Sequence, residues 1–172
     1  MNLDFAPLIP EMFIAGMACV ILVIDLYLRD SQRTTTLVLS VTTLIVAAGL
    51  SLSDFSTGSR LAMNGMFVDD SFADVLKIAI SLITAVVFIY SRDYAMKRDF
   101  YRGEYFVLGL FAVAGMFVMV SAAHLLTLYL GLELLSLCLY VMVAFRRDSE
   151  WASEAAMKYF VLGAIGSGMM LY

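Results

Sequence analysis

The chain has 172 residues and few side chains that bind metals or redox cofactors. Its two cysteines, Cys19 and Cys138, both fall inside apolar runs, and two thiolates are too few for a four-thiolate iron–sulfur or zinc site. His124 is the single histidine, so a haem held by two histidines of this chain is excluded. The composition therefore predicts no metal or cofactor in the chain itself. Any electrons involved in its function travel through other proteins.

Charge is also scarce. Only 15% of the residues are charged and 62% are hydrophobic, with a mean hydropathy of +0.91. A soluble domain has about 25% charged and about 45–50% apolar residues, so this excess of apolar side chains has no aqueous role. The composition predicts a protein whose solvent is the lipid bilayer.

The sequence lacks the common motifs of nucleotide and hydrolase sites. It contains no GxGxxG run, no Walker-type loop and no serine–histidine–acid set. The formal net charge of −4 argues against nucleic acid as a partner. The few arginines are explained by membrane topology.

Six long apolar runs account for most of the chain. Each is close to the length needed to cross about 30 Å of hydrocarbon as a helix. They predict an all-α integral membrane protein with about six transmembrane helices in a single membrane domain, residues 1–172. The runs are 8–28, 34–52, 72–90, 105–123, 125–145 and 152–172.

The basic residues predict the orientation. Eight of the eleven lie in alternate loops: Arg29, Arg33, Arg92, Lys97, Arg98, Arg102, Arg146 and Arg147. The other side carries only Arg60, in a polar loop of residues 53–71. By the positive-inside rule, the basic loops face the cytoplasm and the N-terminus lies outside.

Glu133 is the strongest candidate for function, because it is a carboxylate near the middle of the fifth run. A charge at that depth costs about 2.5–3.5 kcal/mol on insertion scales, so the side chain should face protein or water. Tyr129 precedes it, and Ser136 and Tyr140 follow it, at helical spacing, so the three form one hydroxyl-lined stripe. The pattern favours a proton relay or ion site. The alternative is a protonated glutamate that only joins two helices.

Lys158 lies in the sixth run, seven residues beyond Trp151. A functional role is favoured, but the ammonium could also snorkel to the interface and pair with Glu154 at i,i+4. The depths of Glu133 and Lys158 are expected to differ by about 10 Å, so direct contact is not expected. Glycines and a serine later in the run, Gly163, Gly166, Ser167 and Gly168, predict a face for close helix packing.

Other ionisable residues fall near span ends. Asp74 and Lys77 are three residues apart in the third run and can pair on one helix face, where an interfacial anchor is favoured over a relay for Lys77. Asp25 and Arg29 are interpreted as an ordinary boundary pair. His124 lies at a tight outer reversal, where an interfacial role is favoured over a ligand role.

Two motifs resemble a known family. They are His124-Leu-Leu-Thr-Leu-Tyr-Leu-Gly-Leu-Glu133-Leu-Leu-Ser-Leu and Glu154-Ala-Ala-Met-Lys158-Tyr-Phe-Val-Leu-Gly-Ala. Together with Asp70-Ser-Phe-Ala-Asp74-Val-Leu-Lys77, they resemble the antiporter-like membrane subunits of the proton-pumping NADH:quinone oxidoreductase, respiratory complex I, and most closely subunit N.

The resemblance implies a proton-translocating subunit in the bacterial inner membrane, with Glu133 and Lys158 in the proton path. It also implies partners, namely the other membrane and peripheral subunits, which would carry NADH, FMN, iron–sulfur clusters and quinone. Family members have about fourteen helices with inverted repeats. The chain is therefore expected to be a fragment of a longer subunit. The alternatives are a subunit of a sodium/proton antiporter and a structural packing or assembly module.

Overall fold

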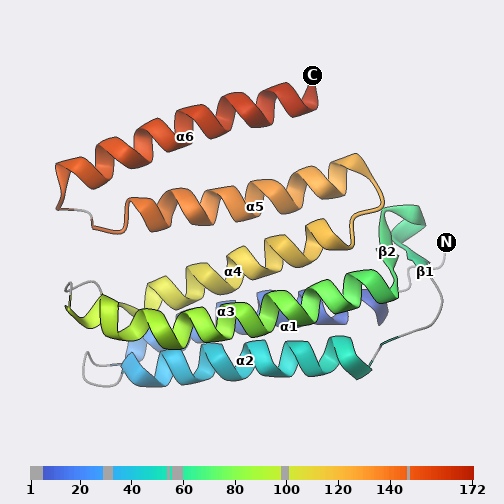
Figure 1. Ribbon diagram of the computed structural model, residues 1–172, viewed down its shortest axis with the longest axis horizontal. Coiled ribbons are helices and arrows are strands. Elements are labelled where there is room, and N and C mark those ends of the chain that lie inside the picture. Colours follow the sequence, from blue (N-terminus) through green and yellow to red (C-terminus); the bar gives the residue numbers. More distant parts are fainter. Residues whose placement is uncertain (1–5, 29–32, 54, 56–59, 98–100, 147) are drawn as a thin grey trace.

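The computed structural model describes residues 6–28, 33–53, 55, 60–97, 101–146 and 148–172. Within these ranges the chain forms six long helices (Figure 1). The helices are α1 Ile9–Tyr27, α2 Arg33–Ser53, α3 Ser71–Lys97, α4 Gly103–Val120, α5 Leu125–Val143 and α6 Glu150–Leu171, and a short 3-10 turn, η1, spans Ala6–Leu8. The predicted all-α fold class is confirmed.

Five of these helices, α1 to α5, are long and apolar enough to cross a membrane. Helix α6 has 22 residues, but Glu150, Glu154 and Lys158 make its first half more polar. The third helix is longer than its predicted run, since it continues past Tyr90 to Lys97. The extra turns are polar, so a prediction from hydropathy alone ended the helix at Tyr90.

Local sequence explains where several helices begin. Pro10 lies in the first turn of α1, where a missing backbone N–H costs nothing. Asp70 precedes α3, and its Oδ1 accepts a hydrogen bond from the backbone N–H of Ala73 at 2.7 Å. His124 precedes α5, and its Nδ1 accepts from the N–H of Leu126 at 3.2 Å. Ser149 precedes α6 in the same way.

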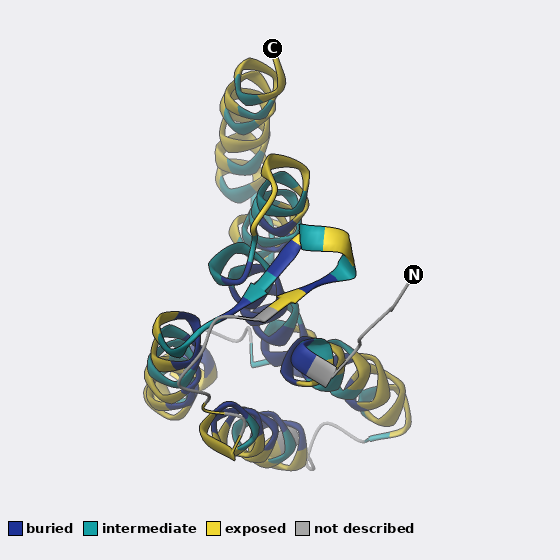
Figure 2. Cartoon of the chain, turned by 90° about the vertical axis from the view of Figure 1, so that its right-hand side faces the viewer, coloured by how far each residue is buried: buried dark blue, intermediate teal, exposed yellow. Residues whose placement is uncertain are grey.

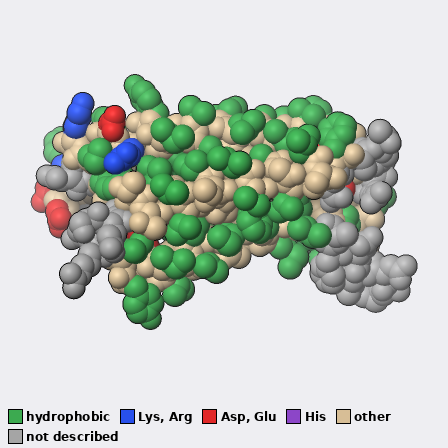
Figure 3. Space-filling model, turned by 90° about the horizontal axis from the view of Figure 1, so that it is seen from below, with side chains coloured by type: hydrophobic (Ala, Val, Ile, Leu, Met, Phe, Trp, Pro, Cys, Tyr) green, Lys and Arg blue, Asp and Glu red, His purple; other side chains and the backbone are tan. Residues whose placement is uncertain are grey.

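The helices are arranged as a bundle with a lateral extension (Figure 2). Helices α1, α2, α3 and α4 pack around a common core, α5 packs on α4, and α6 packs on α5. The core contains Ile14, Leu44, Phe88, Leu110 and Phe117, all buried. Much of the outer surface is apolar along its length, and the visible charged side chains gather at one end (Figure 3). This distribution is that of a bundle whose sides face lipid.

Helices α4 and α5 approach each other closely through two glycines. A Cβ added to Gly115 would lie 2.8 Å from the carbonyl oxygen of Gly131, and the reverse holds for Gly131. The close approach predicted for the sixth run is only partly present. Gly163 lies against Tyr140, but Gly166 and Gly168 have nothing within 4 Å of an added Cβ.

The predicted outer loop contains a small hairpin. Strands β1 Arg60–Ala62 and β2 Phe67–Asp69 pair antiparallel, and a 3-10 turn, η3 Met63–Gly65, joins them. The hairpin also binds the α4–α5 turn, because the N–H of Val68 donates to the carbonyl oxygen of Ser121 at 2.8 Å. The structure therefore ties the start of α3 to the start of α5.

Candidate functional site: ionisable residues inside the helices

The Glu133 side chain is half-buried on α5, two residues beyond Gly131, and Gly131 contacts α4. Tyr129 lies one turn earlier on the same helix, close enough to act electrostatically on the Glu133 carboxylate. The buried Oε1 of Glu133 has no hydrogen-bond partner among the residues that the structure describes. A buried acceptor without a partner is costly.

Tyr140 lies two turns further along the same stripe and contacts α6. Its ring meets Tyr159 edge-on with centroids 4.8 Å apart, and Phe160 with centroids 5.5 Å apart. Its hydroxyl lies where a Cβ on Gly163 would be. The absence of a side chain at Gly163 therefore makes room for the Tyr140 hydroxyl between the two helices. Ser136 is half-buried between Glu133 and Tyr140.

Lys158 pairs with Glu154 one turn earlier, with 2.6 Å between Nζ and Oε1. Both side chains are exposed, at 71% and 57%. The expected i,i+4 pair is present. The Tyr140 ring packs on Tyr159 and Phe160, directly after Lys158, and Glu133 lies seven residues, about 10 Å, from Tyr140 along α5. Glu133 and Lys158 therefore lie at different depths in the bundle.

Lys77 is fully buried, so its ammonium does not reach the interface as an anchor would. Its Nζ lies 2.8 Å from Oε1 of Glu11 on α1 and 5.4 Å from the centroid of the Phe67 ring. Asp74, one turn earlier on α3, is 1% exposed. The interfacial interpretation of Lys77 is therefore wrong, because tertiary packing supplies a buried counter-charge.

Glu11 is not among the site residues predicted from the sequence. Glu11 is 6% exposed, within the first turn of α1. A signal was present, because Glu11 is an acidic residue inside an apolar run with no basic residue three or four positions away. Such a residue needs a partner from another helix.

Asp25 lies at the opposite end of the bundle. Its Oδ1 accepts a hydrogen bond of 2.6 Å from the Thr36 hydroxyl of α2, and its carboxylate occupies the space beside Gly103 of α4. Arg29, its expected partner, lies outside the described residues. Asp25 is thus a packing residue of three helices. The Asp25–Arg29 pair stays a prediction.

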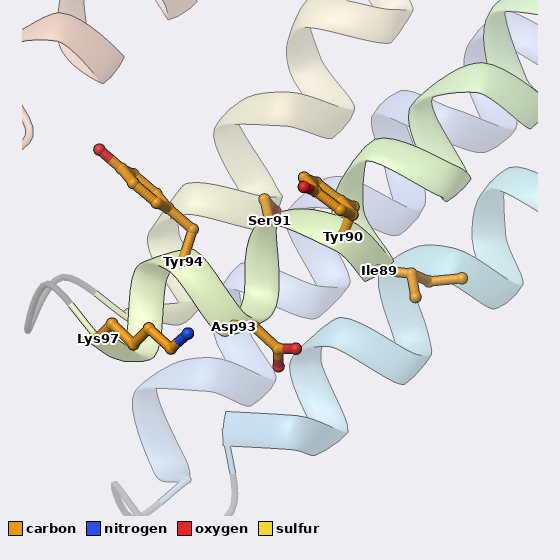
Figure 4. A pocket seen from close by; sticks show the side chains of 6 residues that line it. All are labelled: Ile89, Tyr90, Ser91, Asp93, Tyr94 and Lys97. Atoms are coloured by element: carbon orange, nitrogen blue, oxygen red, sulfur yellow. The ribbon is translucent and has the colours of Figure 1, made fainter.

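A surface hollow of about 660 Å³ lies along the last turns of α3 (Figure 4). Ile89, Tyr90, Ser91, Asp93, Tyr94 and Lys97 line it. Neither Glu133 nor Lys158 contributes to it. Across the described ranges, no three His, Cys, Asp or Glu side chains gather to hold a metal ion.

The fold is shared with respiratory membrane complexes. Respiratory complex I from Thermus thermophilus with bound aureothin contains a chain with a TM-score of 0.78 and 24% identity, covering 95% of this chain and 35% of that one. A chain of the archaeal membrane-bound sulfane sulfur reductase gives a TM-score of 0.68 at 19% identity, covering 96% and 34%. The fold is that of an antiporter-like membrane subunit.

Sequence comparison identifies the family more closely. A model of the family "NADH:quinone oxidoreductase/Mrp antiporter, TM" matches residues 122–172. NADH-quinone oxidoreductase subunit N of Thioalkalivibrio sulfidiphilus is 61% identical over 169 residues, and that of Thiobacillus denitrificans is 58% identical over 170. These alignments cover 98% and 99% of this chain. The chain belongs to the subunit N family of antiporter-like proteins.

The chain spans about a third of the length of these relatives, 35% in both cases. The relatives are bacterial proteins, and five helices of this chain are apolar enough to span a membrane. The chain is therefore a multi-pass protein of the bacterial inner membrane.

Proposed function

We propose that this chain is part of a proton-translocating subunit of a membrane-bound NADH:quinone oxidoreductase, and that Glu133 exchanges the translocated proton. The observation that carries the proposal is the buried Oε1 of Glu133, which has no hydrogen-bond partner among the described residues. An unpartnered carboxylate oxygen inside a membrane span has a strong tendency to take up a proton or a water molecule.

The stripe on α5 supports a path from this carboxylate. Tyr129 and Ser136 flank Glu133, and Tyr140 lies about 10 Å further towards the basic end of the bundle. Lys158 directly precedes Tyr159 and Phe160, the residues of α6 on which the Tyr140 ring packs. Each of these groups can donate and accept protons or hydrogen bonds, or carry a charge that follows the proton. Water molecules would join them, since the gaps exceed hydrogen-bond length.

The energy for translocation comes from other subunits in this proposal. NADH, FMN, iron–sulfur clusters and quinone would bind there, and a conformational change would reach this chain through the membrane subunits. A change that alters water access to Glu133 would change its protonation. Lys77, Asp74 and His124 are proposed to support the path and not to be its main carriers.

Substitution of Glu133 in the complete enzyme tests the proposal. Glu133→Gln keeps size and hydrogen bonding but removes the titratable group, so NADH-driven proton uptake by inverted membrane vesicles should fall severalfold. Glu133→Asp should lose less. Glu150→Gln, the same change at an exposed position on α6, is the control. Uptake at the parental rate by a Glu133→Gln enzyme, assembled in parental amount, would exclude the relay role.

A sodium/proton antiporter is the second candidate, because the family model that matches residues 122–172 includes the Mrp antiporters. The two candidates differ in their partners. Purification of the complete protein with NADH-oxidising flavin subunits supports the first proposal. Purification without them, together with sodium-dependent proton movement, supports the second.

A further inference from the structure

A second buried polar system runs through the α1–α4 bundle, away from Glu133. At one end, the Glu11–Lys77 pair and Asp74 are almost entirely buried. Asp69 of strand β2 is 3% exposed and acts electrostatically on Glu11. Helix α2 brings no ionisable side chain to this end, only the buried Ser51. Four ionisable groups therefore share one buried cluster.

Helix α2 carries four hydroxyl residues among apolar residues on its buried face, and its exposed face carries large apolar residues. Thr36, Ser40, Thr43 and Ser51 are at most 2% exposed. Their opposite face contains Val38, Ile45, Val46 and Leu52, each 47–65% exposed. A soluble helix would place such large apolar side chains inside. In a membrane this pattern indicates a polar interior.

The buried hydroxyls extend across most of the bundle. Thr36 and Ser51 are 15 residues apart, about 22 Å along the helix. Ser81 of α3, one turn beyond Lys77, is fully buried, and its hydroxyl has no hydrogen-bond partner in the described part of the chain. At the far end, Thr36 donates to Asp25 at 2.6 Å. The column thus has an ionisable group at each end.

The hydroxyl groups of α2 can still accept hydrogen bonds from water molecules. Ser40 and Thr43 donate to carbonyl oxygens of their own helix at 2.8 Å, which leaves their oxygens free to accept. Successive buried hydroxyls on α2 from Thr36 to Thr43 are about 4.5–6 Å apart along the axis, a gap that one water molecule spans.

We propose that the Glu11–Lys77 pair is a second proton-exchange site, connected by the buried hydroxyls of α2 and α3 to Asp25 at the opposite end of the bundle. Proton uptake forms an O–H bond on the Glu11 carboxylate and frees the Lys77 ammonium from its ion pair. Loss of a proton towards the hydroxyl column restores the pair, so no redox partner is needed. The inference rests on the proposed function, because it adds a second path to the same proton-translocating subunit.

The decisive variant removes both charges in the complete enzyme. Glu11→Gln combined with Lys77→Met leaves the net charge of the buried cluster unchanged, and each side chain keeps its approximate volume. We expect the number of protons taken up per NADH oxidised, in inverted vesicles with parental amounts of enzyme, to fall at least twofold. A parental ratio would show that the pair only holds α1 and α3 together, and would overturn the proposal.

Single hydroxyl variants decide the question if the double variant does not assemble. Thr43→Val and Ser81→Ala remove one buried hydroxyl each, with little change in shape, and each should lower the same ratio at least twofold. Thr42→Val is the matched control. Thr42 directly precedes Thr43 on α2, is exposed, and donates to the same carbonyl oxygen of Leu39. Parental ratios for both buried variants would overturn the proposal.

The Glu133→Gln enzyme separates the two proposals. Glu133→Gln could lose proton uptake while the Glu11/Lys77, Thr43 and Ser81 variants keep the parental number of protons per NADH. That result would retain the Glu133 path and reject the second one. Losses confined to the Glu11/Lys77, Thr43 and Ser81 variants would reject the relay role of Glu133 and retain the Glu11–Lys77 site.

Discussion

At the scale of single residues, the important polar groups are defined by contacts between helices. Lys77 and Lys158 are both lysines within apolar runs, yet one is fully buried against Glu11 and the other is 71% exposed beside Glu154. A buried pair cannot lose one member cheaply, because the remaining charge stays in a low dielectric. An exposed pair contributes little.

The Tyr140 contact gives a residue-scale prediction. Gly163→Ala places a Cβ on the Tyr140 hydroxyl, so the ring must move and the protein should lose about 1–3 kcal/mol of stability. NADH-driven proton uptake should also fall if Tyr140 lies in the path. Gly166→Ala, three residues later with nothing within 4 Å, is the control and should behave like the parent. Thermal inactivation and uptake of the two variants make the comparison.

His124 gives a second residue-scale prediction. Its Nδ1 caps α5, so His124→Ala should cost about 1 kcal/mol, whereas His124→Asn should retain the cap and the parental stability. Thermal inactivation of the assembled enzyme measures both. Equal losses in the two variants would mean that the imidazole has a role that an amide cannot replace.

At the scale of elements, glycine determines how closely helices pack. The Gly115–Gly131 contact lets the α4 and α5 backbones meet, and α5 carries Glu133 two residues beyond this contact. The position of Glu133 therefore depends on the contact between α4 and α5. The hairpin adds a second constraint, since β2 binds the α4–α5 turn through Ser121 and touches Lys77 through Phe67.

The corresponding prediction concerns Gly131. Gly131→Ala would place a Cβ 2.7–2.9 Å from atoms of Met119 and Gly115, forcing α4 and α5 apart at a cost of about 1–3 kcal/mol. Gly49→Ala, in α2 with nothing within 4 Å, should be neutral or slightly stabilising because alanine favours helix. The yield of assembled enzyme and its thermal inactivation would show the difference. Equal behaviour would contradict the close contact.

At the scale of the whole molecule, the bundle has two chemically different ends. The ends of α1, α3 and α5 and the starts of α2, α4 and α6, near which eight of the eleven basic residues lie in the sequence, are at one end, and the hairpin lies at the other (Figure 1). Helices α5 and α6 extend from the four-helix core as a row, so Glu133 and the Glu11–Lys77 pair belong to different parts of the bundle (Figure 2).

The orientation of these ends is a whole-molecule prediction. Asp148→Cys should react with a membrane-impermeant thiol reagent only from the cytoplasmic side, and Met66→Cys in the hairpin only from the outside, because of the positive-inside rule. Cys19 and Cys138 are replaced by serine in both, and that parent is the unlabelled control. Labelling of Asp148→Cys from outside would reverse the proposed topology.

The fold class followed from sequence because a hydrophobic run of about 20 residues has few alternatives in lipid other than a helix. The Glu133 stripe and the Lys158–Glu154 pair also followed, since both depend on spacing along one helix. The Glu11–Lys77 pair, the Asp25–Thr36 contact and the Gly115–Gly131 approach did not. Each joins residues of different helices, and hydropathy is nearly the same on every side of such a helix. Only tertiary packing decides which polar faces meet.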